Sequence, residues 1–552
     1  MVAEHDGGEA VLEALRALEV EYVFSSPGSE WPAVWEAFTR RAHGAGDGPR
    51  YVNLWHESLA VAMAIGHARY SGRMQAVLLH AGAGPLQGAM AISSAFLRES
   101  PVLVCSGESA SFGELDDFDP GGQWYRGLGV VGGSDRWMAP FVKWSGRVTS
   151  PATLFETLVR AGELALRAPR GPAYLTVPME VLRAPWRPPS HRRRVPSPPV
   201  TVPEEKAVAA VVARIAAAAR PLIVTETAGR DPAAFAHLIR LAEARAIPVV
   251  ESPAAMYANF PKTHPLHRGY DAGPYLADAD LVLVVANRAP WYPPGAAPPP
   301  DAVIVVDDHP IKEQMPYQRL EAGAYLEGDL AATLGLLADA ASAAAGSPPE
   351  CWAAPVAPAR RPPPGTGEGI DPAHLCDLLA GLEGEPAFVD ETIVHRPVLM
   401  RRAAWSMPGS YFRAAGGLGV GLGLALGIKL AAGERLVVTC IGDGSLLYNP
   451  VLPALGAAAE HALPTLIVVF DNRSYESMRR MHLKFYPEGV AAATDTWFGV
   501  DIPGPDYAAV ARSLGAHGER VEDPGRLEDA LGAAVAEVRS GRTALLDVAL
   551  AW

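Results

Sequence analysis

Residues 435–472, RLVVTCIGDGSLLYNPVLPALGAAAEHALPTLIVVFDN, decide the fold of this chain. Two β-branched, apolar runs, RLVVTCI and TLIVVF, flank a segment rich in Ala and Leu. Runs this apolar are typical of strands buried on both faces, and a helix between them suits a crossover connection. The stretch therefore predicts two parallel strands joined by a helix, with polar residues where each strand ends.

The same alternation of apolar runs and helical segments recurs along the chain. The runs lie at 74–80, 101–106, 173–178, 221–226, 247–252, 281–286, 302–307, 387–391 and 543–550. They predict an α/β protein of three domains, each with a mainly parallel sheet flanked by helices. Ligands of such sheets bind at the carboxyl ends of the strands, so the chemistry is expected there.

Two proline-rich segments, 183–203 and 347–365, separate these regions. Proline removes backbone donors and blocks helix interiors, so both segments predict extended linkers. The predicted domains are residues 1–185, 186–346 and 366–552.

Composition limits the function classes. The 552 residues exceed what a single core organises, and 49% hydrophobic with 20% charged residues is typical of a soluble globular protein. The net charge of −14 argues against nucleic acid or an anionic membrane as the main partner. We find no membrane span and no signal-peptide layout. The scattered Cys105, Cys351, Cys376 and Cys440 favour reduced thiols over a disulfide or zinc framework, and together these features predict a cytoplasmic protein.

Polar residues follow both strands of the opening stretch. Asp443 ends one strand and Asn472 the next, and a carboxylate and a carboxamide so placed can bind one small, hard cation such as Mg²⁺. Gly442 and Gly444 allow the backbone to approach a diphosphate, and Ser445 opens the next segment with a donor. A lone Gly-Asp-Gly turn is more often a strand–turn–helix junction capped by Asp, and only the second element favours the metal site.

The two elements together resemble the GDG…N signature of thiamine diphosphate enzymes, in the acetolactate synthase/benzoylformate decarboxylase family of 2-oxo acid decarboxylases and carboligases. The resemblance implies that the Asp443 and Asn472 side chains and the Ser474 carbonyl bind Mg²⁺. It also implies a diphosphate site formed by Gly442, Gly444, Ser445, Tyr448 and Tyr475. Asp471 departs from the commoner Asn, at a position that is not the usual ligand.

A glycine-rich stretch, PGSYFRAAGGLGVGLGLALG at 408–427, extends the resemblance. By position, the Gly416 carbonyl would accept a hydrogen bond from the aminopyrimidine, and Leu418 would hold the cofactor bent. Thr392 is the one hydroxyl kept near the phosphates, because Ile393 and Val394 follow it. Without the resemblance, such a stretch is more often a tightly packed helix.

The segment from His56-Glu57 through SLAVAMAIGHARYSG (58–72) resembles the family's H-E-x-x-A…G-x-A-R-x-(S/T)-G motif. The resemblance implies that Glu57 hydrogen-bonds the pyrimidine N1′ and so drives removal of the thiazolium C2 proton. Such a glutamate is expected to be desolvated, with a raised pKa. The alternative is a glutamate that only stabilises the helix dipole.

The substrate end resembles benzoylformate decarboxylase at two positions. His80, at the end of a predicted strand, would relay protons, and the Ser29 hydroxyl would bind the substrate carboxylate. The alternatives are a histidine that caps a loop and a serine in a turn. Gln87 and Gln123 are further candidates for the pocket.

The loop after Asn472 departs from the family, because Glu476, Met481 and His482 differ from residues expected for benzoylformate. A buried, anionic Glu476 would repel a second carboxylate, and Met481 offers a deformable apolar wall. We therefore expect a monocarboxylic 2-oxo acid with an apolar side chain. The middle domain lacks a dinucleotide glycine fingerprint after 221–226, so it is interpreted as structural and FAD is not expected.

The resemblance implies thiamine diphosphate- and Mg²⁺-dependent decarboxylation of a 2-oxo acid, carboligation, or both, through a C2 carbanion and an enamine. A 2-hydroxyacyl-CoA lyase with the same cofactor is the alternative. A non-catalytic homologue is disfavoured, since Glu57, Asp443 and Asn472 are all present. Family members share the cofactor between two chains, so we expect at least a homodimer and, by the same resemblance, a homotetramer.

Overall fold

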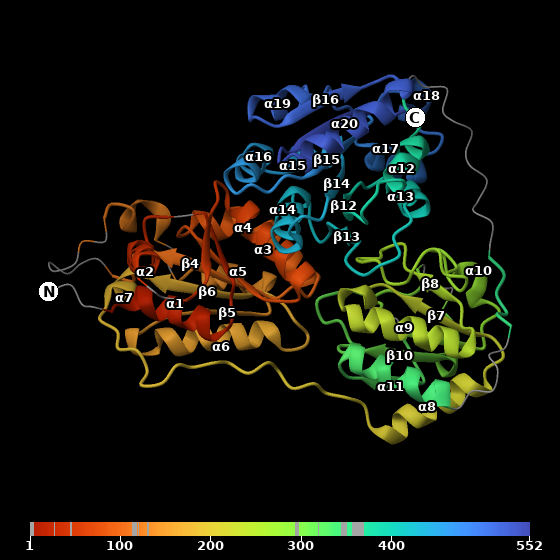
Figure 1. The fold of residues 1–552 in the computed structure, drawn as a ribbon, viewed down its shortest axis with the longest axis horizontal. Helices are drawn as coiled ribbons and strands as arrows, with labels where there is room; N and C mark the ends of the chain where they lie inside the picture. The colour runs from red at the N-terminus through yellow and green to blue at the C-terminus, as the bar shows by residue number, and fades with distance from the viewer. Residues whose placement is uncertain are drawn as a thin grey trace.

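The computed structural model describes residues 5–26, 28–44, 47–112, 119, 121–129, 132–292, 297–317, 320–343, 350–355 and 369–551. Three α/β domains are visible in Figure 1: the N-terminal domain at left, the middle domain at lower right and the C-terminal domain at top. Each contains a sheet whose neighbouring strands are parallel, which confirms the predicted fold class.

The N-terminal sheet has the order β2-β1-β3-β4-β6-β5. Its strands are β1 (Tyr22–Ser26), β2 (Arg50–Asn53), β3 (Gln75–Leu79), β4 (Val102–Glu108), β5 (Trp144–Arg147) and β6 (Ala173–Pro178). One face packs against α1 (Gly7–Ala17), α2 (Pro32–His43), α6 (Leu154–Leu166) and α7 (Met179–Arg183). The other face packs against α3 (Glu57–Ser71) and α4 (Ala83–Leu97), and α5 (Asp135–Met138) adds Met138 to the same core.

The middle sheet has the order β11-β10-β9-β7-β8. Its strands are β7 (Pro221–Thr225), β8 (Val249–Glu251), β9 (Leu281–Val285), β10 (Val303–Asp307) and β11 (Ala324–Glu327). Helices α8 (Glu205–Ala217), α9 (Pro232–Arg245) and α11 (Leu330–Ala343) cover one face, and α10 (Gly273–Leu276) contributes to the core on the other.

The C-terminal sheet has the order β13-β12-β14-β15-β17-β16. Its strands are β12 (Ala387–Glu391), β13 (Tyr411–Arg413), β14 (Val437–Gly442), β15 (Leu466–Asp471), β16 (His517–Val521) and β17 (Ala544–Ala549). One face packs against α12 (Pro372–Ala380), α13 (Arg396–Arg402) and α20 (Leu527–Arg539). The other packs against α14 (Gly421–Ala432), α16 (Val451–Glu460) and α19 (Tyr507–Ser513). The remaining helices, α15 (Asp443–Tyr448), α17 (Glu476–Phe485) and α18 (Val490–Thr494), follow β14 and β15.

Every apolar run singled out in the sequence lies on a strand of these sheets. The sequence does not single out β1, β2, β5, β11, β13 or β16. All of these except β1 lie at a sheet edge, and β2, β5, β11 and β16 are largely half-exposed. A short strand with one exposed face needs no continuous apolar run, so its signal in the sequence is weak.

The first proline-rich segment carries no helix or strand between the end of α7 and the start of α8. In Figure 1 it runs extended beneath α6 towards the middle domain, as predicted for a linker. Most of the second segment lies outside the described residues, and the domain boundaries at 185, 346 and 366 remain predictions. The four cysteines form no disulfide.

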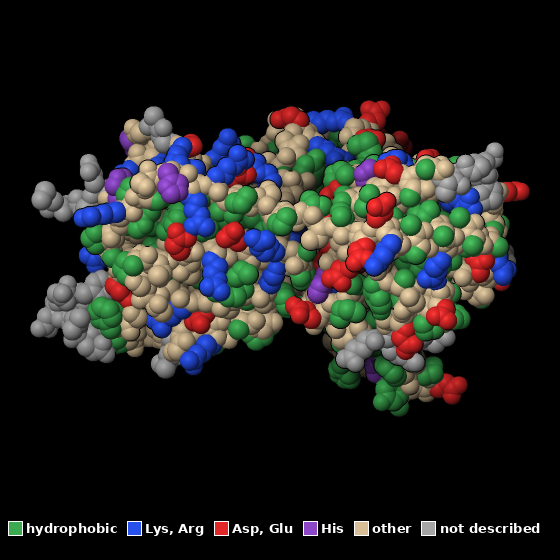
Figure 2. All heavy atoms as spheres, turned by 90° about the horizontal axis from the view of Figure 1, so that it is seen from below, with side chains coloured by type: hydrophobic (Ala, Val, Ile, Leu, Met, Phe, Trp, Pro, Cys, Tyr) green, Lys and Arg blue, Asp and Glu red, His purple; other side chains and the backbone are tan. Residues whose placement is uncertain are grey.

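Within the described part of the chain, no helix combines the length and the apolar character needed to cross a bilayer. On the face drawn in Figure 2, Lys and Arg side chains are interspersed with Asp and Glu.

Helices α3 and α14 join the N-terminal and C-terminal domains at close range. A Cβ added at Gly66 would collide with the Leu424 carbonyl, and one added at Gly427 would collide with the Met63 carbonyl. Their apolar residues belong to one continuous core that includes both sheets. Glycine at these positions therefore lets two helix backbones touch, and this contact sets how the two domains face each other.

Gly427→Ala should destabilise the chain by about 2 kcal/mol, because neither helix backbone can move aside without disturbing the shared core. Urea unfolding measures the change. The matched control is Gly532→Ala on α20, where an added Cβ has no neighbour within 4 Å; it should be neutral or slightly stabilising. Equal effects of the two substitutions would contradict the close contact.

Candidate active site

The predicted metal ligands meet at the carboxyl ends of two adjacent strands. β14 ends at Gly442 and β15 at Asp471, and the two strands pair in parallel, so Asp443 and Asn472 follow neighbouring strand ends. Asp443 is 3% exposed, and its Oδ2 is buried without a hydrogen-bond partner among the described residues. Burial raises the pKa of Asp443 to about 7, and the nearby Asp471 carboxylate adds to the rise.

A buried carboxylate oxygen with no donor fits a bound cation, which would supply the missing positive charge. Among the described residues, no three His, Cys, Asp or Glu side chains form a metal-binding group. The predicted ligand set does not need one, because it combines one carboxylate with an amide and a backbone carbonyl. The residues present therefore fit Mg²⁺ held jointly with a diphosphate.

The diphosphate end is built around small residues. The Tyr475 ring lies against Gly444, where an added Cβ would be 2.6 Å from the ring. Ser445 is buried, whereas Tyr448 is half-exposed and its carbonyl lies against Gly419. The glycine-rich turn and the segment after β14 are thus in contact.

Glu391 is a residue that the sequence analysis missed, and it holds these two segments together. Its carboxylate accepts hydrogen bonds from Gly419 N (2.9 Å), Gly421 N (3.1 Å) and Asn449 Nδ2 (2.8 Å). Asn449 Oδ1 in turn accepts from Leu422 N (3.0 Å). Burial raises the pKa of Glu391 to about 7, while these hydrogen bonds act in the opposite direction. A glutamate at the end of a predicted strand, beside a glycine-rich stretch, was the only signal in the sequence.

The structure corrects the interpretation of Thr392. Its side chain is fully buried, and both its hydroxyl (2.6 Å) and its backbone N–H (2.8 Å) donate to Asp390 Oδ1. Asp390 also binds Arg396 and Tyr411. Because this buried carboxylate takes both donors, Thr392 does not offer its hydroxyl to a phosphate.

Glu391→Gln should lower stability by about 2 kcal/mol and weaken binding of thiamine diphosphate, since an amide nitrogen cannot accept from the backbone N–H groups it would face. Urea unfolding and cofactor-induced circular dichroism measure the two effects. The control, Glu383→Gln, changes an exposed carboxyl in the same domain and should alter neither. Parent-like cofactor affinity in Glu391→Gln would contradict the role of this carboxylate.

The remaining predicted residues lie in the N-terminal domain. Glu57 is the first residue of α3, after His56, whose Nδ1 accepts from Ser58 N. Glu57 is only half-buried in the single chain, so the full desolvation expected for it is not reached there. His80 directly follows β3. Its hydrogen bond to Glu30 raises its pKa, and the charge of Glu57 adds to the rise. The Ser29 hydroxyl donates to Gln123 Oε1 at 3.0 Å, which brings two predicted pocket residues together.

Helix α4 of the N-terminal domain packs against the glycine-rich turn of the same chain. Ser94 Oγ donates to the Ala415 carbonyl at 2.6 Å, next to Gly416, whose φ of 91° favours glycine. Met90 lies against Gly417 and is half-exposed, and Leu86 and Gln87 on the same helix are exposed as well. Leu418, within the turn, is partly buried. The turn and α4 therefore form one surface that carries exposed apolar side chains.

The structure also changes the interpretation of Glu476. It is 8% exposed at the start of α17, but it binds Arg480 (3.1 Å) and lies 3.8 Å from Arg479. These cations compensate its charge, so it gives no reason to reject a second carboxylate. Met481 is half-exposed and shares one face of α17 with Met478 and Phe485, which are also exposed. His482 packs against Tyr486 and Trp497.

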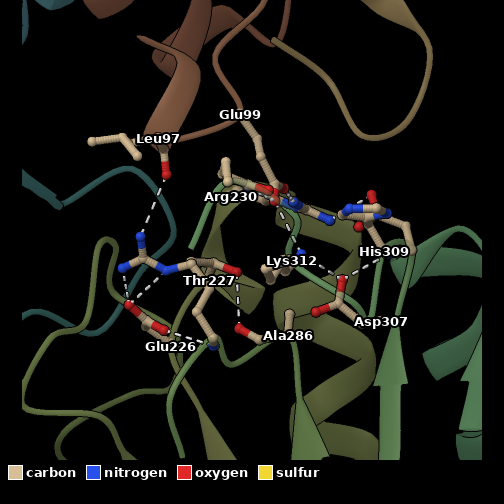
Figure 3. Close-up of polar contacts among 12 residues, drawn as sticks. Leu97, Glu99, Glu226, Thr227, Arg230, Ala286, Asp307, His309 and Lys312 are labelled. Carbon is tan, nitrogen blue, oxygen red and sulfur yellow. Dashed lines mark hydrogen bonds and ion pairs between the residues drawn. The ribbon is translucent and has the colours of Figure 1, made fainter. Parts of the chain in front are cut away.

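The middle domain carries a cluster of charges at the carboxyl edge of its sheet (Figure 3). Glu99, just after α4, binds Arg230 and Lys312 at 3.0 Å each, and Lys312 also binds Asp307. Burial acts to raise the pKa of Glu99, but the two cations outweigh it and lower the pKa. Arg288, beyond β9, pairs with Glu226, beyond β7.

β7 and β9 are neighbouring strands. After β7 the chain continues to β8 on one side of the pair, and after β9 it continues to β10 on the other. Ligands of α/β sheets bind at the carboxyl ends of strands that diverge in this way. Between the N-terminal and middle domains at this point, the cluster leaves a cavity of about 40 Å³. The structural role of the middle domain and the expected lack of FAD both remain predictions.

Three family models of thiamine pyrophosphate enzymes match the chain in order. The N-terminal binding domain matches residues 5–116, the central domain 208–337 and the C-terminal binding domain 395–548. The chain belongs to the thiamine pyrophosphate enzyme family. Its fold, cofactor class and assignment as a thiamine-dependent 2-oxo acid decarboxylase or carboligase follow from this membership and from its relatives.

The chain is 29% identical to benzoylformate decarboxylase of Pseudomonas aeruginosa, with 96% of each chain covered. It is 25% identical to the large subunit of acetolactate synthase isozyme 3 of Escherichia coli, covering 98% of this chain and 94% of that one. Among solved structures, a thiamine diphosphate-dependent 4-hydroxybenzoylformate decarboxylase of Rhodococcus jostii superposes with a TM-score of 0.83 at 26% identity, with 99% of each chain covered.

Proposed function

We propose that this thiamine enzyme uses Mg²⁺ and decarboxylates a monocarboxylic 2-oxo acid with an apolar side chain, with or without transfer of the product to an acceptor aldehyde or ketone. The observation that carries the metal is the buried, unpartnered Oδ2 of Asp443 beside Asn472, in the domain that matches the cofactor-binding model. When bound, the cofactor supplies an electron sink for the carbonyl carbon of the substrate.

Residues of this chain would bind the metal, the cofactor and the substrate. Asp443, Asn472 and the Ser474 carbonyl would hold the metal, while Gly444 and Tyr475 would border the diphosphate. Glu57, the first residue of α3, would hold a proton at the pyrimidine N1′. Ser29 binds the substrate carboxylate, and His80 exchanges a proton with the substrate.

The substrate class rests on the apolar face of α17. Met478, Met481 and Phe485 are at least half-exposed along one face of this helix, which begins directly after the metal loop. A wall of flexible thioethers and an aromatic ring favours an apolar side chain of variable shape. The compensated charge of Glu476 plays no part in this preference.

Carbon dioxide release should be fastest with branched or aryl monocarboxylic 2-oxo acids, in a panel that includes pyruvate and dicarboxylic acids, with and without an acceptor aldehyde. Glu57→Gln should fold normally and lose at least about 10²-fold of this activity, because the cofactor is no longer activated. Thermal melting verifies folding. Fastest turnover of a dicarboxylic acid would contradict the substrate class, and no release from any acid would favour a 2-hydroxyacyl-CoA lyase.

We also propose that two chains assemble to complete the site. Leu86 and Met90 of α4, Leu447 and Tyr448 of α15, and Leu452 of α16 are about half-exposed or more around the glycine-rich turn. Water-exposed apolar surface of this kind, beside a cofactor site, is typical of an interface. Burial against a second copy would also desolvate Glu57. A homodimer is the minimum, and a homotetramer made of two such dimers is expected.

Met90→Glu should shift the protein towards monomers and lower cofactor affinity, because a buried charge in an interface costs several kcal/mol. Light scattering after size-exclusion chromatography measures the assembly. Leu336→Glu on α11 introduces the same charge at an exposed leucine of the middle domain and should leave assembly unchanged. A monomeric parent with full activity would contradict the shared site.

Two narrower predictions accompany this function. Purified protein should show no flavin absorption, since the charge cluster of Glu99, Arg230 and Lys312 fills the crevice of the middle domain.

A cytoplasmic location remains the expectation from the sequence.

A further inference from the structure

Glu30 forms a buried pair with His80 that the sequence analysis did not foresee. Its Oε2 lies 2.9 Å from His80 Nδ1, its side chain is 0% exposed, and its Oε1 has no partner among the described residues. The His80 side chain is 22% exposed, so one part of the ring remains accessible. A carboxylate hidden from water thus faces one nitrogen of the ring and leaves the rest of it open to the site.

The arrangement of strands in the sheet brings Glu30 and His80 together. β1 and β3 are parallel neighbours with Ser26 opposite Leu79, so the turn after β1 and His80 after β3 lie at the same edge. A Cβ at Gly28 would collide with both His80 Nδ1 and Glu30 Oε2. A Cβ at Gly107 on β4 would lie 2.5 Å from Glu30 Cβ. Two glycines therefore make room for the carboxylate and the imidazole to meet.

The contact has two consequences for the histidine. A carboxylate accepts only, so Nδ1 must carry a proton, which leaves Nε2 to exchange a proton with a ligand. The hydrogen bond to Glu30 raises the pKa of His80 above its ordinary value, against the effect of burial, and the charges of Glu30 and Glu57 raise it further. Glu108, at the end of the neighbouring strand β4, is paired with Arg147.

We propose that Glu30 is a positioning residue that fixes a proton on His80 Nδ1 and favours the cationic imidazole, so that His80 acts as a proton donor through Nε2. This inference rests on the proposed decarboxylase function and adds the direction of proton transfer. The proton passes from Nε2 to the substrate-derived group after carbon dioxide leaves, and solvent returns it to the ring. Glu30 remains the partner of Nδ1 throughout and does not touch the substrate.

Histidine-labelled full-length enzyme with bound cofactor tests this by NMR, with the His80 signals identified by their loss in His80→Ala. In the parent, His80 should be cationic at pH 7, and above its titration the proton should remain on Nδ1. In Glu30→Gln, His80 should lose its charge at a pH lower by at least about one unit, because the anion that favours the cation is gone. The limb of the kcat/KM profile at high pH should move to lower pH by the same amount.

Glu108→Gln is the matched control, since it neutralises a neighbouring buried carboxyl that binds Arg147 and should leave the titration of His80 unchanged. A neutral His80 at pH 7 in the parent, or a proton on Nε2 above its titration, overturns the inference even if Glu30→Gln fails to fold. An unchanged titration in Glu30→Gln overturns it while decarboxylation persists. A shifted titration without decarboxylation of any 2-oxo acid instead removes the proposed function and leaves the Glu30–His80 pair standing.

Discussion

The backbone contact between α3 and α14 is the constraint on which the rest of the structure depends. Gly66 and Gly427 allow each helix to approach a carbonyl of the other, and the shared core then spans both domains. α3 begins at Glu57, and α14 follows directly on the glycine-rich turn at 416–419. A single packing contact therefore fixes how one chain presents Glu57 and the glycine-rich turn, each of which would face a second chain in the shared site.

Buried carboxylates organise the site around that contact, and their surroundings decide what each does. Glu391 is surrounded by donors and serves as a structural anchor for the glycine-rich turn. Asp443 keeps an oxygen without a donor, which suits a metal ligand. Glu30 faces an imidazole and controls its protonation. A buried charge without compensation is costly in free energy. The groups around each of these carboxylates therefore indicate its role.

Some predicted residues change meaning once their neighbours are known. The resemblance left the Thr392 hydroxyl for a phosphate, but in the structure this hydroxyl donates to Asp390. Glu476 is buried, as the substrate argument assumed, but Arg480 compensates its charge. In both cases the residue lies where the sequence predicts it. Its hydrogen-bonding or ionic partner, Asp390 or Arg480, is a side chain whose role the sequence pattern does not specify. Residue identity alone does not reveal which of its potential hydrogen bonds are already used.

The sequence by itself determined the fold class, the central strands other than β1 and the strand-end positions of Asp443, Asn472 and His80, because continuous apolar runs and the polar residues that follow them are local signals. Glu57 came from the resemblance of its segment to a family motif. It did not reveal the edge strands β2, β5, β11 and β16, whose largely half-exposed residues carry no such run. Only the tertiary structure decided that Glu391 anchors the glycine-rich turn and that Glu30 meets His80. These contacts join segments that are distant along the chain, and strand register and helix packing, which local periodicity does not encode, bring them together.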